Sequence, residues 1–348
     1  MTSPSRSPPR SPAPELIPDP HAEEEEREAR DDDDAGYDSG SIQTATTSVN
    51  SSIFDWVYEN GRRYHSYRPT QYVLPNDEEE QDRLDLTHHL FTLVLQGGYC
   101  MTRLDSPEAI LDVGTGTGIW AIDMADLYPS AIVTGTDLSP IQPQWVPPNA
   151  RFEVDDANEE WTFPEQHFDF IHARTICAGI RDFPQFLAKC YAHLKPGGKI
   201  EVSEGRANFF CDDDTFPADS YTRTWLDELH RCAALVHLDI DHIPKVPEEL
   251  ERAGFVSVEF VQKHVPVGTW PKDKSLKVIG KIFREQFVAS ALEAYSLKLL
   301  CEVGNWSLPE FQVLCANVRR ELTENKMHLY TFWSVASRRH PSMPRELC

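Results

Sequence analysis

The sequence has no run of about 20 apolar residues, the length that a membrane-spanning helix requires, so we expect no transmembrane segment. Its N-terminal region is polar and proline-rich, which argues against a signal peptide. Basic residues are few: 33 lysines and arginines stand against 56 aspartates and glutamates, for a net charge of −23. Nonspecific nucleic-acid binding needs a positive surface that releases counterions, so we expect no direct binding of nucleic acid.

Closely spaced metal ligands are also missing. The eight cysteines are scattered singly along the chain, which excludes an obvious zinc or iron–sulfur cluster and suits reduced thiols in the cytoplasm and nucleus. His88 and His89 are adjacent on a predicted helix, where neighbouring side chains point apart. We therefore expect no metal site.

The first 50 residues have a composition of their own. They hold twelve acids against four arginines, and proline and serine dominate the start. Such a segment buries too little apolar area to offset its ordering entropy, so residues 1–47 are predicted to form a disordered acidic tail. The tail either solvates the protein or docks on a basic partner.

The most informative stretch is an apolar strand pattern that runs into three alternating glycines, Gly114, Gly116 and Gly118. Glycine lets the backbone approach a ligand closely, and the free N–H groups of the following helix point at that ligand. A dinucleotide fingerprint places its third glycine three residues after the second, which here is Ile119. The alternating glycines, with Asp112 two residues ahead, resemble instead the first motif of S-adenosylmethionine-dependent methyltransferases.

An acid closes the next predicted strand, over 131–137. Asp137 lies 19 residues beyond Gly118, close to the interval of about 20 at which a carboxylate accepts hydrogen bonds from both ribose hydroxyls in nucleotide-binding folds. Leu138, the next residue, is a further candidate cofactor contact. S-adenosylmethionine is therefore the expected cofactor.

A third strand, predicted over 151–154, runs into a pair of acids. The resemblance to methyltransferases implies that Asp156 accepts from the adenine amino group and that the backbone N–H of Ala157 donates to the adenine. Asp155 is an alternative to Asp156.

The remaining pattern completes an α/β fold. Strands are predicted at 168–174 and 199–204, and the phrase LKPGGKIEVSE, which ends at Glu204, is typical of the approach to the fifth methyltransferase strand. Strands at 255–261 and 328–336 are expected to form an antiparallel hairpin at one sheet edge. The fold class is therefore α/β: a class I methyltransferase, Rossmann-like, with a seven-stranded sheet and helical insertions.

Two segments are expected to roof the cleft beside the cofactor: residues 205–245 and the helices predicted over 273–303 and 307–323. Five aromatic residues in and near these segments either line an acceptor pocket or belong to the core: Phe209, Phe210, Tyr221, Trp225 and Trp270. No catalytic residue is assigned. His172, at the end of the fourth strand, is either a general base or a hydrogen-bonded structural histidine.

Residues 51–98, which precede the glycine loop, indicate which family of methyltransferases the sequence resembles. Leu86, Leu90 and Leu93 share one face of a helix predicted over 81–96, whereas the preceding "ENGRRYH" and "LPNDEEEQDRLDL" show no such periodicity. With the methyltransferase motifs, this stretch resembles the LaeA-like fungal methyltransferases, the group that contains the velvet-complex regulator of secondary metabolism. The resemblance covers about residues 48–338.

The segment before the helix is also predicted to act as a lid. Tyr64 and Tyr67 are expected to close over the cofactor from this segment, with Tyr64 as a cofactor contact. The domain over 48–340 accordingly divides into three parts: the lid and helix (48–100), the cofactor-binding core (107–204), and the acceptor-side insertions with the last strands (205–340).

The resemblance implies a methyltransferase that regulates fungal secondary metabolism and development within a protein complex, so regulatory protein partners are expected. Two alternatives stay open: a small-molecule methyltransferase of a biosynthetic pathway, and a cofactor-binding scaffold with little activity. The methyl acceptor is accordingly either a protein or a small molecule.

Overall fold

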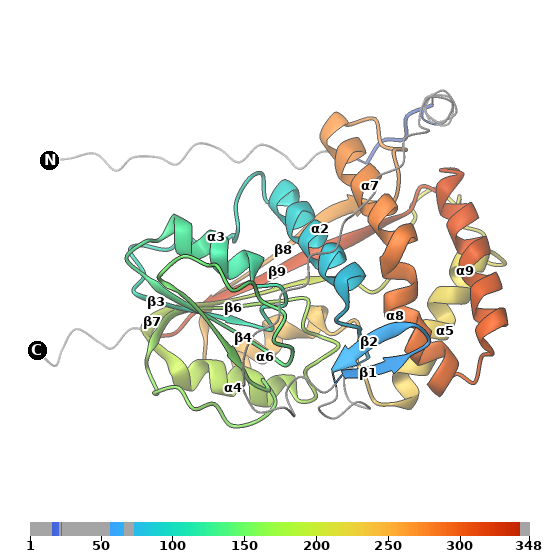
Figure 1. The fold of residues 1–348 in the computed structure, drawn as a ribbon. Coiled ribbons are helices and arrows are strands. Elements are labelled where there is room, and N and C mark those ends of the chain that lie inside the picture. The colour runs from blue at the N-terminus through green and yellow to red at the C-terminus, as the bar shows by residue number, and fades with distance from the viewer. Residues whose placement is uncertain (1–15, 21, 23–55, 66–72, 342–348) are drawn as a thin grey trace, which may run out of the picture.

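A seven-stranded sheet forms the centre of the computed structural model, which describes residues 16–20, 22, 56–65 and 73–341 (Figure 1). The strand order is β5-β4-β3-β6-β7-β9-β8. The first five strands in this order, β5 to β7, run parallel to one another. β9 runs antiparallel to both β7 and β8. The strands are β3 (Ala109–Val113), β4 (Ile132–Asp137), β5 (Ala150–Val154), β6 (Phe168–Arg174), β7 (Leu194–Gly205), β8 (Val256–Pro266) and β9 (Tyr330–Arg339).

This topology confirms the predicted α/β fold and its antiparallel edge. Two strands are longer than predicted. β7 begins at Leu194, which pairs with Phe168 ahead of an irregularity in the ladder, and β8 continues to Pro266, which pairs with Tyr330. Pairing with β9 extends β8 beyond the apolar pattern that marks it in the sequence.

Helices cover both faces of the sheet because successive strand residues point to opposite sides. On β3, Ile110 packs with Trp120 of α3, whereas Leu111 packs with Leu187 of α4 on the other face. The helices are α2 (Glu78–Val94), α3 (Ile119–Leu127), α4 (Phe183–His193), α5 (Tyr221–Leu235), α6 (Val246–Arg252), α7 (Lys274–Gln286), α8 (Leu292–Lys298) and α9 (Leu308–Thr323). No helix in the described ranges is both long and apolar enough to cross a membrane.

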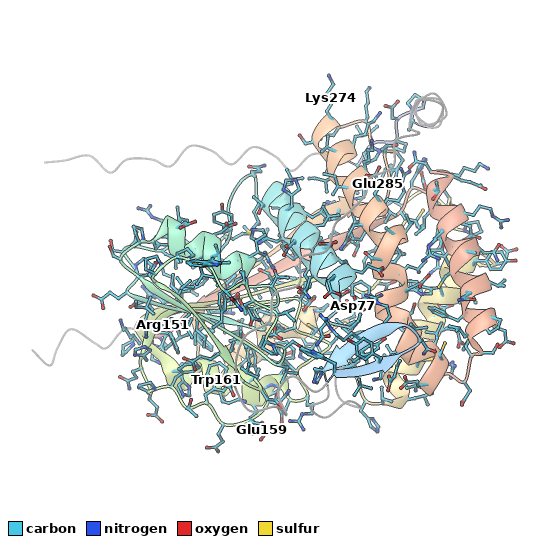
Figure 2. All side chains as sticks on the ribbon, in the orientation of Figure 1. Asp77, Arg151, Glu159, Trp161, Lys274 and Glu285 are labelled. Carbon is cyan, nitrogen blue, oxygen red and sulfur yellow. The ribbon has the colours of Figure 1, made fainter. Side chains whose placement is uncertain are left out.

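The predicted helical insertion forms a second core beside the sheet, in which α5, α8 and α9 pack together. The run from 274 to 303 is one continuous helical path in which π-helical turns, η2 (Phe287–Ala291) and η3 (Leu299–Val303), alternate with α-helix. On α7, Lys274 and Glu285 point outward, whereas Leu276 and Ile279 are buried (Figure 2). This amphipathic pattern is typical of a helix that packs on one face.

A short antiparallel hairpin, β1 (Trp56–Glu59) and β2 (Arg62–His65), precedes α2 and was not predicted. Four-residue strands are too short to show alternation, but the turn has a recognisable signal, Asn60-Gly61, with φ of 52° and 82°. α2 also begins three residues earlier than predicted, because the Asp77 side chain caps it by accepting from the Glu80 N–H.

Part of the predicted tail lies against the start of α7. The Asp19 N–H donates to the Trp270 carbonyl at 2.6 Å, and the Lys272 N–H donates to the Ile17 carbonyl at 2.7 Å. The residue before a proline favours extended backbone, so Ile17 and Asp19, on either side of Pro18, can pair in this way. The prediction of a wholly disordered tail is therefore wrong for residues 16–20; the rest of the tail, apart from residue 22, lies outside the described residues.

This contact can be tested through the ion pair between Asp19 and Lys277, whose charged atoms lie 2.6 Å apart. Asp19→Ala and Lys277→Ala are each expected to lower the free energy of unfolding by ~0.5–1 kcal/mol, because the pair is partly buried. The double variant should lose less than the sum of the two, as measured by denaturant unfolding. Lys281→Ala, on the exposed side of the same helix, is the control; additive losses would show that the two residues do not interact.

Candidate functional site

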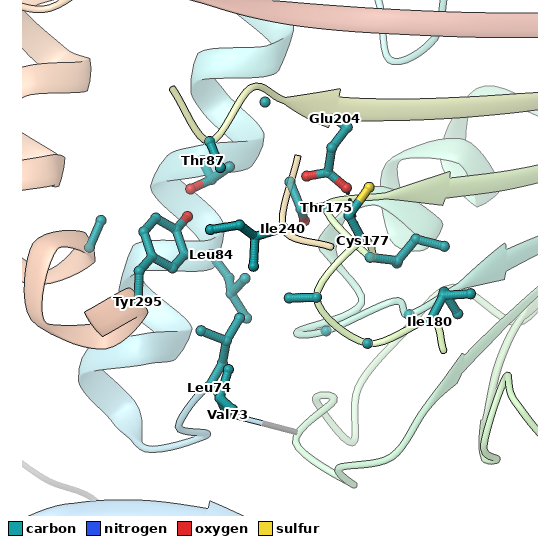
Figure 3. A pocket seen from close by; sticks show the side chains of 18 of the residues that line it. Val73, Leu74, Leu84, Thr87, Thr175, Cys177, Ile180, Glu204, Ile240 and Tyr295 are labelled. Atoms are coloured by element: carbon teal, nitrogen blue, oxygen red, sulfur yellow. Dashed lines mark hydrogen bonds between the residues drawn. The ribbon is translucent and has the colours of Figure 1, made fainter. Parts of the chain in front are cut away.

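A cavity of about 250 Å³ lies at the carboxyl ends of the five parallel strands (Figure 3). This is where ligands bind in open α/β sheets, and the volume far exceeds what a single buried water needs. The lining segments follow β3, β4, β5, β6 and β7 in turn: Val113–Gly114, Thr136–Leu138, Asp155–Asn158, Thr175–Ile180 and Glu204–Phe209. Five strand ends therefore meet in one cavity.

The glycine loop requires its glycines for their backbone conformation and for the space that a side chain would fill. All three have positive φ, between 58° and 82°. A Cβ on Gly114 would lie 2.7 Å from Ile176, and one on Gly118 would lie 2.5 Å from the Phe152 ring. Gly114 and Gly116 line the cavity, whereas Gly118 does not and instead gives α3 room to pack against β5.

Asp137 lines the cavity and is held firmly in place. Its Oδ2 accepts from the Gly116 N–H at 2.8 Å, and its Oδ1 accepts from the Ser139 N–H at 2.9 Å. Burial raises the pKa of this carboxyl. Each carboxylate oxygen can accept more than one hydrogen bond, so Asp137 can still accept from two ribose hydroxyls.

The predicted adenine contacts lie next to Asp137 along the cavity. Leu138, Asp155, Asp156 and Ala157 all line it. Asp156 Oδ1 accepts from both the backbone and the side-chain N–H groups of Asn158, each at 2.9 Å. The structure thus brings these residues together with Asp137, and their individual roles toward adenine stay predictions.

Asp112 and His172 lie behind the glycine loop and are not among the cavity-lining residues. Asp112 Oδ2 accepts from the Thr115 hydroxyl at 2.6 Å, and its Oδ1 lies 2.7 Å from Nδ1 of His172. The His172 ring, 1 % exposed, stacks on Trp120 with centroids 3.7 Å apart. This geometry fits the structural alternative for His172 and gives Asp112 the role of fixing the loop from behind.

Tyr64 does not line the cavity either. Its buried ring lies under the Lys298 ammonium, 4.7 Å from the ring centroid, and burial raises the pKa of its phenol to about 12. Its predicted contact with the cofactor stays a prediction, and Tyr67 lies outside the described residues. Val73 and Leu74, which follow in the chain, do line the cavity.

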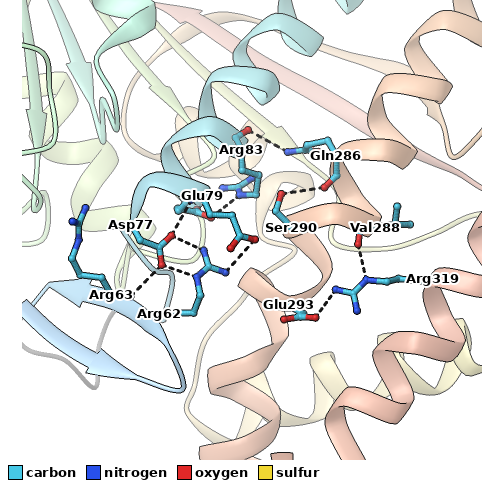
Figure 4. Close-up of polar contacts among 11 residues, drawn as sticks. Arg62, Arg63, Asp77, Glu79, Arg83, Gln286, Val288, Ser290, Glu293 and Arg319 are labelled. Carbon is cyan, nitrogen blue, oxygen red and sulfur yellow. Dashed lines mark hydrogen bonds and ion pairs between the residues drawn. The ribbon is translucent and has the colours of Figure 1, made fainter. Parts of the chain in front are cut away.

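Asn76 and α2 contact the loops that are predicted to bind the cofactor. The Asn76 side chain donates to the Ser139 hydroxyl at 3.1 Å, and Thr117 donates to Asp85 at 2.6 Å. Arg62 of the hairpin makes two hydrogen bonds to Asp77, the capping residue of α2 (Figure 4). These contacts connect the hairpin, α2 and the glycine loop in one polar network.

The far side of the cavity is an apolar chamber. It is lined by Phe209, Trp225, Leu226, Leu229, Ile240, Phe287 and Leu299. Phe209 and Trp225 thus face the cavity as well as packing in the insertion core, whereas Phe210, Tyr221 and Trp270 do not line it. Residues of 205–245 and of 273–303 cover the cleft as expected, whereas no residue of 307–323 lines the cavity.

Sequence reasoning missed several polar residues of the cavity, among them Glu204, Arg83 and Tyr295. Arg83 donates to the Tyr295 hydroxyl at 2.8 Å, although the two residues are 212 positions apart in the sequence. Within the described part of the chain, no group of three or more histidines, cysteines, aspartates or glutamates is arranged to hold a metal ion.

The position of β9 in the sheet identifies the class of protein. An antiparallel strand inserted between β7 and β8 distinguishes this sheet from the all-parallel order of dinucleotide-binding folds. Together with the glycine loop and Asp137, it defines a class I S-adenosylmethionine-dependent methyltransferase. Residues 83–259 match the family model described as a methyltransferase domain.

Relatives show the same family over most of the chain. The chain is 41% identical over 296 residues to "Methyltransferase pytC" of Aspergillus terreus, covering 84% of this chain and 90% of the relative. It is 39% identical over 290 residues to "Secondary metabolism regulator LAE1" of Cochliobolus heterostrophus, covering 81% and 94%. It is 33% identical over 297 residues to "Protein-methionine methyltransferase laeA" of Emericella nidulans, covering 84% and 79%. The chain belongs to the LaeA-like methyltransferases, with S-adenosylmethionine as its cofactor and a role in secondary metabolism.

Proposed function

We propose that this methyltransferase regulates fungal secondary metabolism and development together with regulatory protein partners, in the cytoplasm and nucleus. The observation that carries the proposal is the extent of the similarity to relatives named as regulators. The general methyltransferase model ends at residue 259, whereas the LAE1 alignment spans 81% of this chain and 94% of the relative. It therefore includes sequence outside the general methyltransferase domain, as does the alignment to pytC, which spans 84% of this chain.

A second candidate function, a small-molecule methyltransferase of one biosynthetic pathway, is favoured by the apolar chamber. Small-molecule sites are concave and mostly apolar, with a few placed polar groups. Most of the cavity lining is apolar, and Glu204, Arg83, Tyr295 and Gln286 are among its polar side chains.

The two candidates differ in the breadth of their effects. Deletion of the gene in the fungus that carries it should change many unrelated metabolites if the protein is a regulator, and one compound family if it is a pathway enzyme. Complementation with Asp137→Ala should fail to restore the profile, because the cofactor would bind poorly. Affinity purification of the full chain should recover stable protein partners. A change confined to one compound family, with no stable partner, would contradict the regulatory proposal.

A further inference from the structure

Glu204 is a buried carboxylate at the junction of the cofactor groove and the apolar chamber. It is the next-to-last residue of β7, is 7% exposed and lines the cavity. Its Oε2 accepts from the Cys177 N–H at 3.0 Å. Figure 3 shows its carboxylate directed toward the cavity, with Tyr295 on the opposite side.

Among the described residues, no lysine, arginine or histidine forms an ion pair with Glu204. The two arginines of the same cavity do have carboxylate partners: Arg83 pairs with Glu80, and Arg206 with Asp241, each at 2.7 Å. Burying a carboxylate without a cation is unfavourable, and burial raises the pKa of Glu204 to about 7. Both its charged and its neutral forms are therefore accessible near neutral pH.

The strand order places Glu204 at the acceptor end of the cavity. Adenosine-binding candidates follow β5 and β4, the glycine loop follows β3, and Glu204 lies at the end of β7. A cofactor with its adenosine over β4 and β5 therefore directs its methyl group toward β6 and β7. Beyond Glu204 the lining is mostly apolar, with Trp225, Leu229 and Phe287.

The lining also restricts the acceptor. A polypeptide would bring backbone N–H and C=O groups that need partners, and an apolar chamber supplies few. An ammonium would carry its charge into the same surroundings. A neutral hydroxyl enters without charge, but it is a weak nucleophile until a base accepts its proton.

We propose that Glu204 is the general base that takes the proton from a phenol-type hydroxyl of a small, mostly apolar acceptor bound in the chamber. An oxygen–methyl bond forms while the sulfur–methyl bond breaks, and its electron pair stays on sulfur, giving neutral S-adenosylhomocysteine. The hydroxyl proton moves to the Glu204 carboxylate, which becomes a carboxylic acid. The proposal rests on methyl transfer at this site and applies to both candidate functions.

The test measures transfer from methyl-labelled S-adenosylmethionine to 4-propylphenol by the full chain. Glu204→Gln is expected to lower turnover by about 10²–10⁴-fold, the usual contribution of a general base, while leaving the affinity for S-adenosylhomocysteine essentially unchanged. Wild-type turnover should rise as the pH passes through about 7, where the carboxylate forms, and this rise should be absent in Glu204→Gln. Glu201→Gln, on the same strand and buried outside the cavity, is the matched control and should keep the pH dependence.

Three outcomes would overturn the proposal. Glu204→Gln could turn over 4-propylphenol as fast as the wild type. The wild type could methylate the thioether ethyl propyl sulfide but not the phenol, which would assign Glu204 to stabilising a sulfonium product. The wild type could also bind S-adenosylhomocysteine and methylate no phenol. Failure to bind S-adenosylhomocysteine at all would instead contradict the methyltransferase assignment itself.

Discussion

A chain that begins at Glu78 is expected to lose S-adenosylmethionine binding although it retains every strand of the seven-stranded sheet. Val73 and Leu74 would no longer close the cavity, and Asn76 would no longer bond to Ser139 beside the end of β4, where the ribose is predicted to bind. A lid of this kind excludes water and supplies contact area to the ligand. Isothermal titration with S-adenosylhomocysteine measures the loss.

Truncation also removes Asp77, which caps α2, and the contact of residues 16–20 with the chain before α7, so thermal melting must show that the shortened chain still unfolds cooperatively. Asn76→Ala is the milder variant and should weaken binding without lowering the melting temperature by more than a few degrees. Arg103→Ala, at an exposed ion pair away from the cavity, is the control. Full affinity in the folded, truncated chain would show that this segment is not a lid.

The second large effect is expected at Asp137. Asp137→Ala should weaken S-adenosylhomocysteine binding by ~1–3 kcal/mol, because it removes charged hydrogen bonds to the ribose and releases the Gly116 N–H. Asp126→Ala removes the same charge from the exposed face of α3 and should bind normally. NADH should not compete with S-adenosylhomocysteine in the wild type. Unchanged affinity in Asp137→Ala, or tight binding of NADH, would remove the ribose assignment.

The cofactor half of the site could be predicted because its chemistry is local in sequence. The glycine spacing and the interval from Gly118 to Asp137 reflect one βαβ unit, and both residues lie where that unit requires. Asp112 belongs to the same motif. Its side chain supports the loop through Thr115 and His172, and its contact with the cofactor stays a prediction.

The acceptor half could not be predicted, because its residues meet only in the folded chain. The pairs Arg83–Tyr295 and Gln286–Thr87 join α2 to the insertion across about 200 residues, so no spacing in the sequence predicts them. Glu204 ended a recognised motif, but only its burial and its lack of an ion pair among the described residues single it out. The hairpin was missed despite its Asn60-Gly61 signal, because its strands are only four residues long.

A crystal structure of the full chain with S-adenosylhomocysteine tests the central claim most directly. We expect one molecule in the cavity, with the ribose hydroxyls on Asp137, the adenine beside Asp155 to Ala157, and the sulfur directed toward the end of the cavity that holds Glu204. S-adenosylhomocysteine bound at another place, or in the reverse direction along the strand ends, would contradict it.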